Sequence, residues 1–231
     1  MMLFRSDFDR RIDLPGAGPC ARPTDVDQGR TGFSDLVSLR VYSFVQGMEI
    51  DGEAEDDEVF IVLMRGEADL VISSGSAMTE IPLRHDGGSH VIYMPPSASY
   101  RLSAIRDCDI AYARTKPVGG DPRPPRGFAA KGGRLEIIGY ATGMDVALAT
   151  ISAGETVDQV EPPSERFVHV RSDDGGSASI GEHRLNDWDT IAVGSGERVL
   201  LKGHAGSVDM LMITGLQRHG ERSQGSDVGN E

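Results

Sequence analysis

The sequence is poor in cysteine, in aromatic residues and in positive charge. Its 231 residues include two cysteines, one tryptophan, and 23 Lys and Arg against 36 Asp and Glu. Cys20 and Cys108 form no CxxC pair, which excludes a disulfide framework and a zinc knuckle. The formal net charge of −13 argues against nucleic-acid binding, because phosphate recognition needs clustered Lys and Arg. We therefore expect no nucleic-acid partner.

Long apolar runs are also missing. The first residues, Met1 to Asp7, contain no stretch long enough for a signal peptide, and no window approaches the length of a membrane span. Two unpaired cysteines fit a reducing compartment. These absences predict a cytoplasmic protein with no membrane partner.

The sequence does contain an internal repeat. With a shift of 107 residues, Gly32-Phe33 aligns with Gly139-Tyr140, Glu58 with Glu165, and Phe60 with Phe167. After a shortening of eight residues in the second copy the shift is 99, and Tyr100 aligns with Val199. A period this long, present twice, predicts a duplicated domain of roughly 100 residues per copy.

Short apolar segments, separated by turn residues and often alternating, dominate both copies. Such segments predict strands, and helical periodicity is scarce, so we expect an all-β protein. The expected strands of the first copy are residues 39–45, 59–64, 68–72, 90–94 and 110–113; those of the second are 146–151, 166–170, 178–180, 189–193, 199–201 and 210–213.

Composition suggests how these segments divide into domains. The predicted organisation is an N-terminal arm (1–29), a first barrel (30–115), a Pro/Gly-rich linker (116–134), a second barrel (135–216) and a disordered tail (217–231). Each repeat has the outline of a cupin, the double-stranded β-helix or jelly roll. The predicted fold is thus a bicupin, two tandem cupin barrels.

The cupin metal motif is absent from both copies. It places two histidines one residue apart, a glutamate five residues later and a final histidine, so that alternate strand residues point into the barrel. Counting from Glu58, the histidine positions hold Asp51, Glu53 and Tyr100; counting from Glu165, they hold Asp158, Val160 and Val199. We expect no transition-metal site of this type and no cofactor.

Two sets of polar residues remain as candidate sites. Asp51, Glu53 and Glu58 could hold a hard cation such as magnesium, but acidic runs are more often solvated loops. If Glu165 faces the interior of the second barrel, then Phe167, His169 and Arg171 share that face, and the pocket could bind an anionic or hydroxylated molecule. The alternative is a hydrogen-bonded interior His169 with Arg171 at a wet strand end.

Three segments carry a resemblance to a known family. The runs 57–68, 91–102 and 109–113 resemble the N-terminal barrel of the bicupin sugar isomerases, which include 5-deoxy-glucuronate isomerase and 5-keto-4-deoxyuronate isomerase. In that family the first barrel also lacks metal ligands and an aromatic residue often replaces the last histidine, as Tyr100 does here. The resemblance implies isomerisation of an acidic sugar at a zinc site in the second barrel. The chain departs from the family there, with residues 157–163 and Val199 in place of the family's histidine-containing segment and late histidine.

Two functional hypotheses follow. In the first, the protein is non-catalytic or regulatory and binds a small sugar-acid-like molecule in a barrel, with Tyr100, Glu58, Phe167 and Arg171 as ligand-binding candidates. In the second, it is an isomerase-like enzyme on a sugar acid, with His169 and Glu165 as acid and base. A homodimer is compatible with either hypothesis, because cupins often pair through exposed sheet edges.

Overall fold

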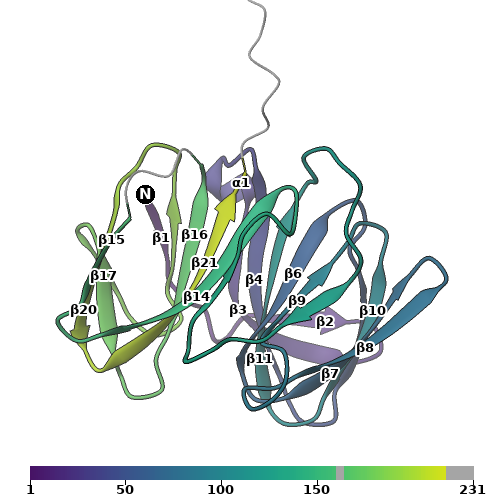
Figure 1. The fold of residues 1–231 in the computed structure, drawn as a ribbon. Helices are drawn as coiled ribbons and strands as arrows, with labels where there is room; N and C mark the ends of the chain where they lie inside the picture. The colour runs from purple at the N-terminus through teal and green to yellow at the C-terminus, as the bar shows by residue number, and fades with distance from the viewer. Residues whose placement is uncertain (160–163, 217–231) are drawn as a thin grey trace, which may run out of the picture.

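The protein is built almost entirely from β-strands. The computed structural model describes residues 1–159 and 164–216, which form 21 strands and one helix of four residues, α1 (Gln28–Thr31). The strands build four sheets, arranged as two pairs that lie side by side (Figure 1). We call these pairs the N-terminal and the C-terminal sandwich.

The N-terminal sandwich contains a seven-stranded and a four-stranded sheet. The larger sheet has the order β12 (Arg126–Phe128), β9 (Val91–Met94), β6 (Glu58–Arg65), β11 (Cys108–Thr115), β4 (Leu36–Phe44), β3 (Gly18–Asp27) and β2 (Arg11–Leu14). The smaller has the order β5 (Glu49–Glu53), β10 (Ser99–Ala104), β7 (Ala68–Ser74) and β8 (Ala77–Leu83). Apolar side chains from both sheets, among them Phe44, Ile61 and Leu102, form one core between them.

The C-terminal sandwich has the same plan. Its six-stranded sheet has the order β1 (Met2–Phe4), β19 (Thr190–Val193), β16 (Arg166–Arg171), β21 (Ser207–Gly215), β14 (Met144–Ser152) and β13 (Leu135–Ile137). Its four-stranded sheet has the order β15 (Thr156–Gln159), β20 (Val199–Ala205), β17 (Ser177–Ile180) and β18 (His183–Leu185). Val168, Ile180 and Leu201 belong to the core between these two sheets.

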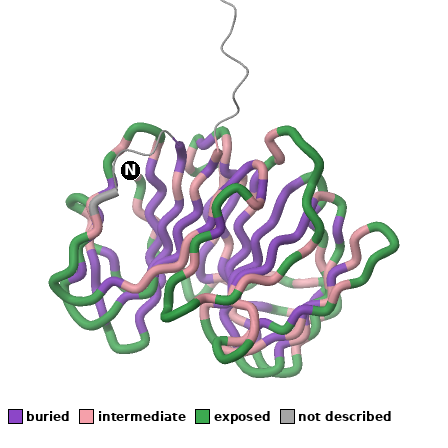
Figure 2. The backbone as a smooth tube through the Cα atoms, in the orientation of Figure 1, coloured by how far each residue is buried: buried purple, intermediate pink, exposed green. Residues whose placement is uncertain are grey.

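A third core joins the sandwiches. The two large sheets pack face to face through side chains that include Phe60, Tyr93, Phe167 and Leu211. The central strands are therefore buried on both faces, as the purple strands in the middle of Figure 2 show. This explains why β6 contains a continuous apolar run and not an alternating one.

The expected strands are all present, and the all-β prediction is confirmed. Each of the eleven predicted segments overlaps a strand. Ten strands were not predicted, and eight of them are the edge strands of the four sheets: β1, β13, β12, β2, β5, β8, β15 and β18. An edge strand buries less apolar surface than a central one, so its sequence carries a weaker hydrophobic pattern.

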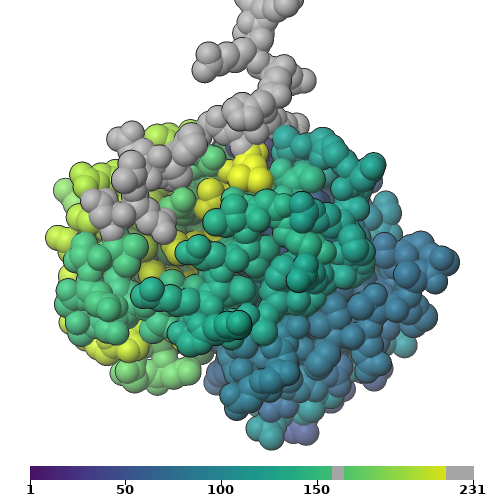
Figure 3. All heavy atoms as spheres, viewed as in Figure 1, coloured from purple at the N-terminus to yellow at the C-terminus, as the bar shows by residue number. Residues whose placement is uncertain are grey.

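The segments outside the two predicted barrels add strands to both sandwiches. Strand β1, in the predicted arm, pairs with β19 of the C-terminal sandwich, whereas β2 and β3 pair with the N-terminal one. Strand β12, in the predicted linker, pairs with β9. In Figure 3 the teal segment that follows the N-terminal sandwich lies across the junction between the two. The predicted tail, 217–231, lies outside the described residues.

Sheet closure differs from the simple picture of two barrels. None of the four sheets in the described part of the chain closes on itself, so each predicted barrel is present as two open sheets packed face to face. No helix within 1–159 and 164–216 is long and apolar enough to cross a membrane.

Candidate functional site

Glu58 is fully buried and binds the other half of the chain. It accepts hydrogen bonds from the backbone N–H groups of Thr142 and Gly143 at 2.9 and 2.8 Å, and from the Tyr93 hydroxyl at 2.8 Å. Thr142 Oγ1 also donates to it at 3.0 Å. The predicted ligand-binding role has no support in this geometry, because the carboxylate is already surrounded by donors that hold the start of β14 against β6.

Glu165 makes the reciprocal contact. Its two oxygens accept the backbone N–H groups of Ser34, Asp35 and Leu36 at 2.6, 2.7 and 3.1 Å, and the Ser34 hydroxyl at 3.1 Å. Residues 34–36 lie at the start of β4, as residues 141–143 lie just before β14, and the two segments differ by the shift of 107 found in the sequence. The two glutamates therefore act as a pair of clamps between the sandwiches, and Glu165 is not placed as a free acid or base.

His169 lies at the junction of the sandwiches and not inside the C-terminal core. Strand alternation does put Glu165, Phe167, His169 and Arg171 on one face, as expected, but Phe167 belongs to the junction core, whereas Val168 and Val170 face the interior. Because both faces of β16 are buried, apolar pattern alone could not distinguish them. His169 is fully buried, and its Nδ1 lies 2.9 Å from Thr190 Oγ1.

Burial keeps His169 neutral. Desolvation, and secondly the charge of Arg171, lower its pKa from 6.5 to about 3. The unfolded chain therefore takes up a proton near pH 6.5 that the folded chain does not bind until about pH 3. The stability that this residue contributes is fully present above pH 6.5 and declines as the pH falls below it.

We expect the pH dependence of stability to reveal this residue. Between pH 7 and pH 5, His169 should account for a loss of about 2 kcal/mol in the free energy of unfolding. His169→Asn keeps a polar group near Thr190 and removes the titration, so its stability should fall less over this range. Urea denaturation of both proteins at pH 5, 6 and 7 measures the difference; parallel pH profiles would contradict the assignment.

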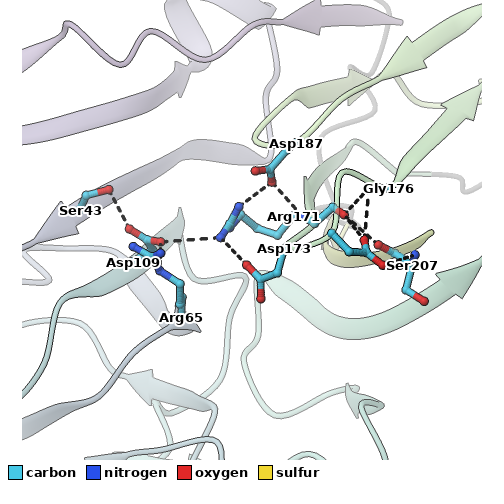
Figure 4. A network of polar contacts seen from close by, with 10 residues as sticks. Ser43, Arg65, Asp109, Arg171, Asp173, Gly176, Asp187 and Ser207 are labelled. Atoms are coloured by element: carbon cyan, nitrogen blue, oxygen red, sulfur yellow. Dashed lines mark hydrogen bonds and ion pairs between the residues drawn. The ribbon is translucent and has the colours of Figure 1, made fainter. Parts of the chain in front are cut away.

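Arg171 is engaged by carboxylates from both sandwiches (Figure 4). Its guanidinium lies 2.5 Å from Asp187 Oδ1, 3.2 Å from Asp173 Oδ1 and 3.9 Å from Asp109 Oδ2 on β11. It also lies over the ring of Trp188, 4.6 Å from the centroid. Arg171 is buried, so these contacts leave it no access to a ligand, and the alternative of a wet strand end does not apply either.

The three acidic candidates for a cation do not come together. Asp51 is exposed and pairs with Arg101 on the outer face of the small N-terminal sheet, and Glu53 shares that outer face by alternation. Glu58 faces the junction between the sandwiches. Among the residues described, no three His, Cys, Asp or Glu side chains are placed to hold a metal ion.

A pocket that the sequence did not predict as a unit opens into the N-terminal sandwich. Its volume is about 180 Å³, and it lies between the two sheets of that sandwich. Its charged and aromatic lining residues are Arg40, Tyr42, Phe44, Asp51, Glu53, Tyr100, Tyr112 and Arg114. Tyr100, one of the predicted ligand-binding residues, is therefore in this pocket, whereas Phe167 and Arg171 are elsewhere.

Three tyrosine rings form its aromatic wall. The ring of Tyr112 lies 5.4 Å from that of Tyr42 and 5.9 Å from that of Tyr100. Burial raises the pKa of Tyr100 to about 12, and burial together with Tyr100 raises the pKa of Tyr112 well above its usual range. Both hydroxyls are therefore protonated at neutral pH and can donate hydrogen bonds. That of Tyr112 is buried and has no hydrogen-bond partner of normal geometry among the described residues.

Gly52 makes room for the Tyr100 ring. The two residues are opposite each other on β5 and β10. A Cβ at position 52 would lie 2.5 Å from the ring atoms and hydroxyl of Tyr100, so only glycine permits this close approach. The ring thus lies across β5 at the pocket wall.

The two arginines differ in their surroundings. Arg114 Nε lies 2.8 Å from the buried Asp57 and its Nη2 donates to Glu55 at 2.9 Å, so its charge is balanced. Arg40 Nε lies 3.2 Å from Asp25. In the sequence, Arg40 and Tyr42 are two residues apart, as are Tyr112 and Arg114, so each pair shares one face of its strand. The sequence does not show that the two pairs lie together, because this depends on the pairing of β4 with β11.

The corresponding positions of the C-terminal sandwich are apolar. Tyr112 is opposite Arg40 on β11 and β4, and in the same register Met212 is opposite Ala147 on β21 and β14. Among the described residues, the C-terminal sandwich therefore has no counterpart of Arg40 and Tyr112 at these two positions.

A larger hollow of about 730 Å³ lies on the outer face of the small N-terminal sheet. Its charged side chains include Asp51 and Arg101, which already pair with each other in solvent. Nothing buried or unpartnered points to a ligand there.

A comparison with models of protein families shows which family the chain belongs to. The model of the KduI/IolB family matches residues 21–143, more than half of the sequence. The chain belongs to the KduI/IolB family. No significant match was found among curated proteins.

Solved structures related to this KduI/IolB member confirm a cupin-related fold. An IolB-like protein from Salmonella typhimurium LT2 has a TM-score of 0.69 at 14% identity, covering 94% of this chain and 93% of that one. Protein Ylba from E. coli has a TM-score of 0.68 at 15% identity, covering 95% and 92%. A mutant of Bacillus subtilis oxalate decarboxylase has a TM-score of 0.67 at 9% identity, covering 93% and 77%.

The zinc site that the resemblance implies does not fit the side chains of this family member. In the described part of the C-terminal sandwich, Glu165 is enclosed by the N–H groups of residues 34–36, and Val199 occupies the late histidine position. Val160, at another ligand position, lies outside the described residues.

Proposed function

We propose that the protein binds a small sugar acid in the pocket of the N-terminal sandwich and does not isomerise it. The observation that carries this proposal is the grouping of Tyr42, Tyr100 and Tyr112 with Arg40 around one cavity. Membership of the KduI/IolB family supports a sugar acid as the ligand class. We also propose that the chain is a bicupin, whose N-terminal copy has Arg40 and Tyr112 where the C-terminal copy has Ala147 and Met212.

The chemistry of the pocket suits a hydroxylated ring with a carboxylate. Aromatic faces pack against the C–H groups of a sugar, and protonated tyrosine hydroxyls donate to its oxygens. The hydroxyl of Tyr112 is buried beside that of Tyr100, so the two hydroxyls form one polar group inside the pocket. A guanidinium recognises a carboxylate through charge-assisted hydrogen bonds.

Binding is favoured over isomerisation because the carboxylates of the pocket wall, Asp51 and Glu53, are exposed to solvent, and Asp51 is paired with Arg101. Proton transfer to and from a sugar carbon needs a group whose pKa lies near the working pH. Tyr100 and Tyr112 have raised pKa values and stay protonated. The buried carboxylate of Asp57 is paired with Arg114 and Lys116 at 2.8 and 2.6 Å. Family membership favours the second candidate, a sugar-acid isomerase, which the following experiment separates from the first.

The test is a calorimetric titration of D-glucuronate into the wild-type protein and into the Tyr112→Phe variant. The variant keeps the ring and removes the hydroxyl, so the affinity should fall about 5- to 10-fold, the contribution of one buried hydrogen bond. Tyr140→Phe is the matched control, because that hydroxyl bonds to Pro124 O at an exposed site. Its affinity should equal that of the wild type.

Proton NMR of the same mixtures tests for catalysis. We expect the glucuronate spectrum to remain unchanged. Conversion to a ketose that is lost in Tyr112→Phe would establish the isomerase instead, and absence of binding by any sugar acid at millimolar concentration would exclude both candidates.

A further inference from the structure

Three arginines surround a single carboxylate at the edge of the N-terminal pocket. Asp25 on β3 lies 3.4 Å from Arg10 Nη1, 3.0 Å from Arg22 Nη2 and 3.2 Å from Arg40 Nε. Asp7 adds only a 3.9 Å contact to Arg10. In a chain with a formal net charge of −13, this is a local excess of positive charge.

The cluster is continuous with the pocket. Arg40 and Tyr42 are lining residues, and the guanidinium of Arg22 lies over the Tyr42 ring, 5.9 Å from its centroid. Arg22 Nε is buried and has no hydrogen-bond partner among the described residues. The side chains of Arg22 and Arg40 are 20% and 32% exposed, which leaves them reachable but partly shielded from water.

Partial burial strengthens the attraction of such a cluster for an anion. Charges near a protein surface interact several times more strongly than they would in bulk water. Asp25 offsets one of the three positive charges and holds the guanidiniums in place, so an incoming carboxylate meets donors that are already oriented. Among the other charged residues of the pocket, Arg114 is paired with Asp57 and Glu55, Asp51 is paired with Arg101, and Glu53 is exposed to solvent.

We propose that Arg22 and Arg40, held by Asp25, form the subsite that binds the anionic group of the ligand, while Tyr100 and Tyr112 bind its uncharged part. This inference rests on the proposed function of the pocket and deepens it. It assigns anion selectivity to β3 and β4, and Asp25 acts as a positioning residue. In the described part of the C-terminal sandwich, Ala147 occupies the position that corresponds to Arg40, so that position supplies no guanidinium there.

The experiment compares ligands that differ in charge. Wild-type protein, Arg22→Gln and Arg40→Gln are titrated by calorimetry with D-glucuronate, with D-glucose and with inorganic phosphate. The wild type should bind glucuronate at least 10-fold more tightly than glucose. Each variant should lose most of that preference while its affinity for glucose stays unchanged. Added salt should weaken glucuronate binding to the wild type more than to the variants, because the charge contribution is screened.

A matched control removes an arginine elsewhere on the same sandwich. Arg101 pairs with Asp51 on the exposed outer face, and Arg101→Gln should bind glucuronate like the wild type. Thermal denaturation of every variant verifies that it is folded.

The outcomes separate this inference from the proposed function. Variants that retain the full glucuronate preference overturn the subsite and leave the sugar-acid proposal intact. Binding of phosphate but not of glucuronate, lost in both arginine variants, supports the anion subsite and overturns the sugar acid as ligand. Failure of the wild type to bind either anion overturns the subsite.

Discussion

Replacing Glu58 with alanine is expected to lower the free energy of unfolding by about 4 kcal/mol. The substitution leaves the N–H groups of Thr142 and Gly143 and the hydroxyl of Tyr93 without their acceptor at a buried position of the junction. Each buried donor left unsatisfied costs about 1–3 kcal/mol. Urea denaturation measures the loss. The corresponding substitution in the C-terminal sandwich, Glu165→Ala, should show a loss of similar size.

Conservative variants identify the clamp role. Glu58→Gln and Glu165→Gln keep the shape of the side chain but replace a carboxylate that accepts N–H donors on both oxygens. We expect each to lose about half as much stability as the alanine variant, since one oxygen remains as an acceptor. A Glu165→Gln protein that is fully stable but loses a catalytic activity would contradict the clamp and return Glu165 to an acid or base role.

Arg171→Met is expected to destabilise the protein by about 3 kcal/mol. Methionine keeps much of the side-chain volume but removes the ion pairs with Asp187 and Asp173, and the longer contact to the buried Asp109. Breaking a buried charge network by removing one member costs about 3–5 kcal/mol, and the cost here is moderated because Asp109 keeps Arg65 and Ser43 as partners.

Arg171→Lys serves as the comparison. It preserves the charge, but the compact ammonium group lacks the planar fork with which a guanidinium contacts several carboxylates at once. We therefore expect a loss of stability smaller than that of Arg171→Met. Sugar-acid affinity should be unchanged in both variants because Arg171 is not among the residues that line the N-terminal pocket. A drop in affinity with unchanged stability would instead support the ligand-binding role that the sequence suggested for Arg171.

The site was predicted less well than the fold. Tyr100 was recognised as the residue in place of a histidine ligand, and it does line the pocket. Tyr112, Tyr42 and Arg40 were missed, because their proximity depends on how β11 pairs with β4 and how β3 brings Asp25 beside Arg40. These contacts join residues far apart in the chain, and no local pattern encodes them.

The residue pattern alone predicted an all-β protein and eleven of its strands, aligned Glu58 with Glu165 at a shift of 107 residues, and showed that the cupin histidines are absent at the aligned positions. These features depend on residue identity and on spacings along one strand, which local periodicity expresses directly. The packing of the two sandwiches was needed to show which face of β16 meets the other sandwich, and hence that Glu58 and Glu165 are clamps and that His169 is a neutral junction residue. The physical reason is that both faces of the central strands are buried, so their alternation identifies two faces without telling what covers either one.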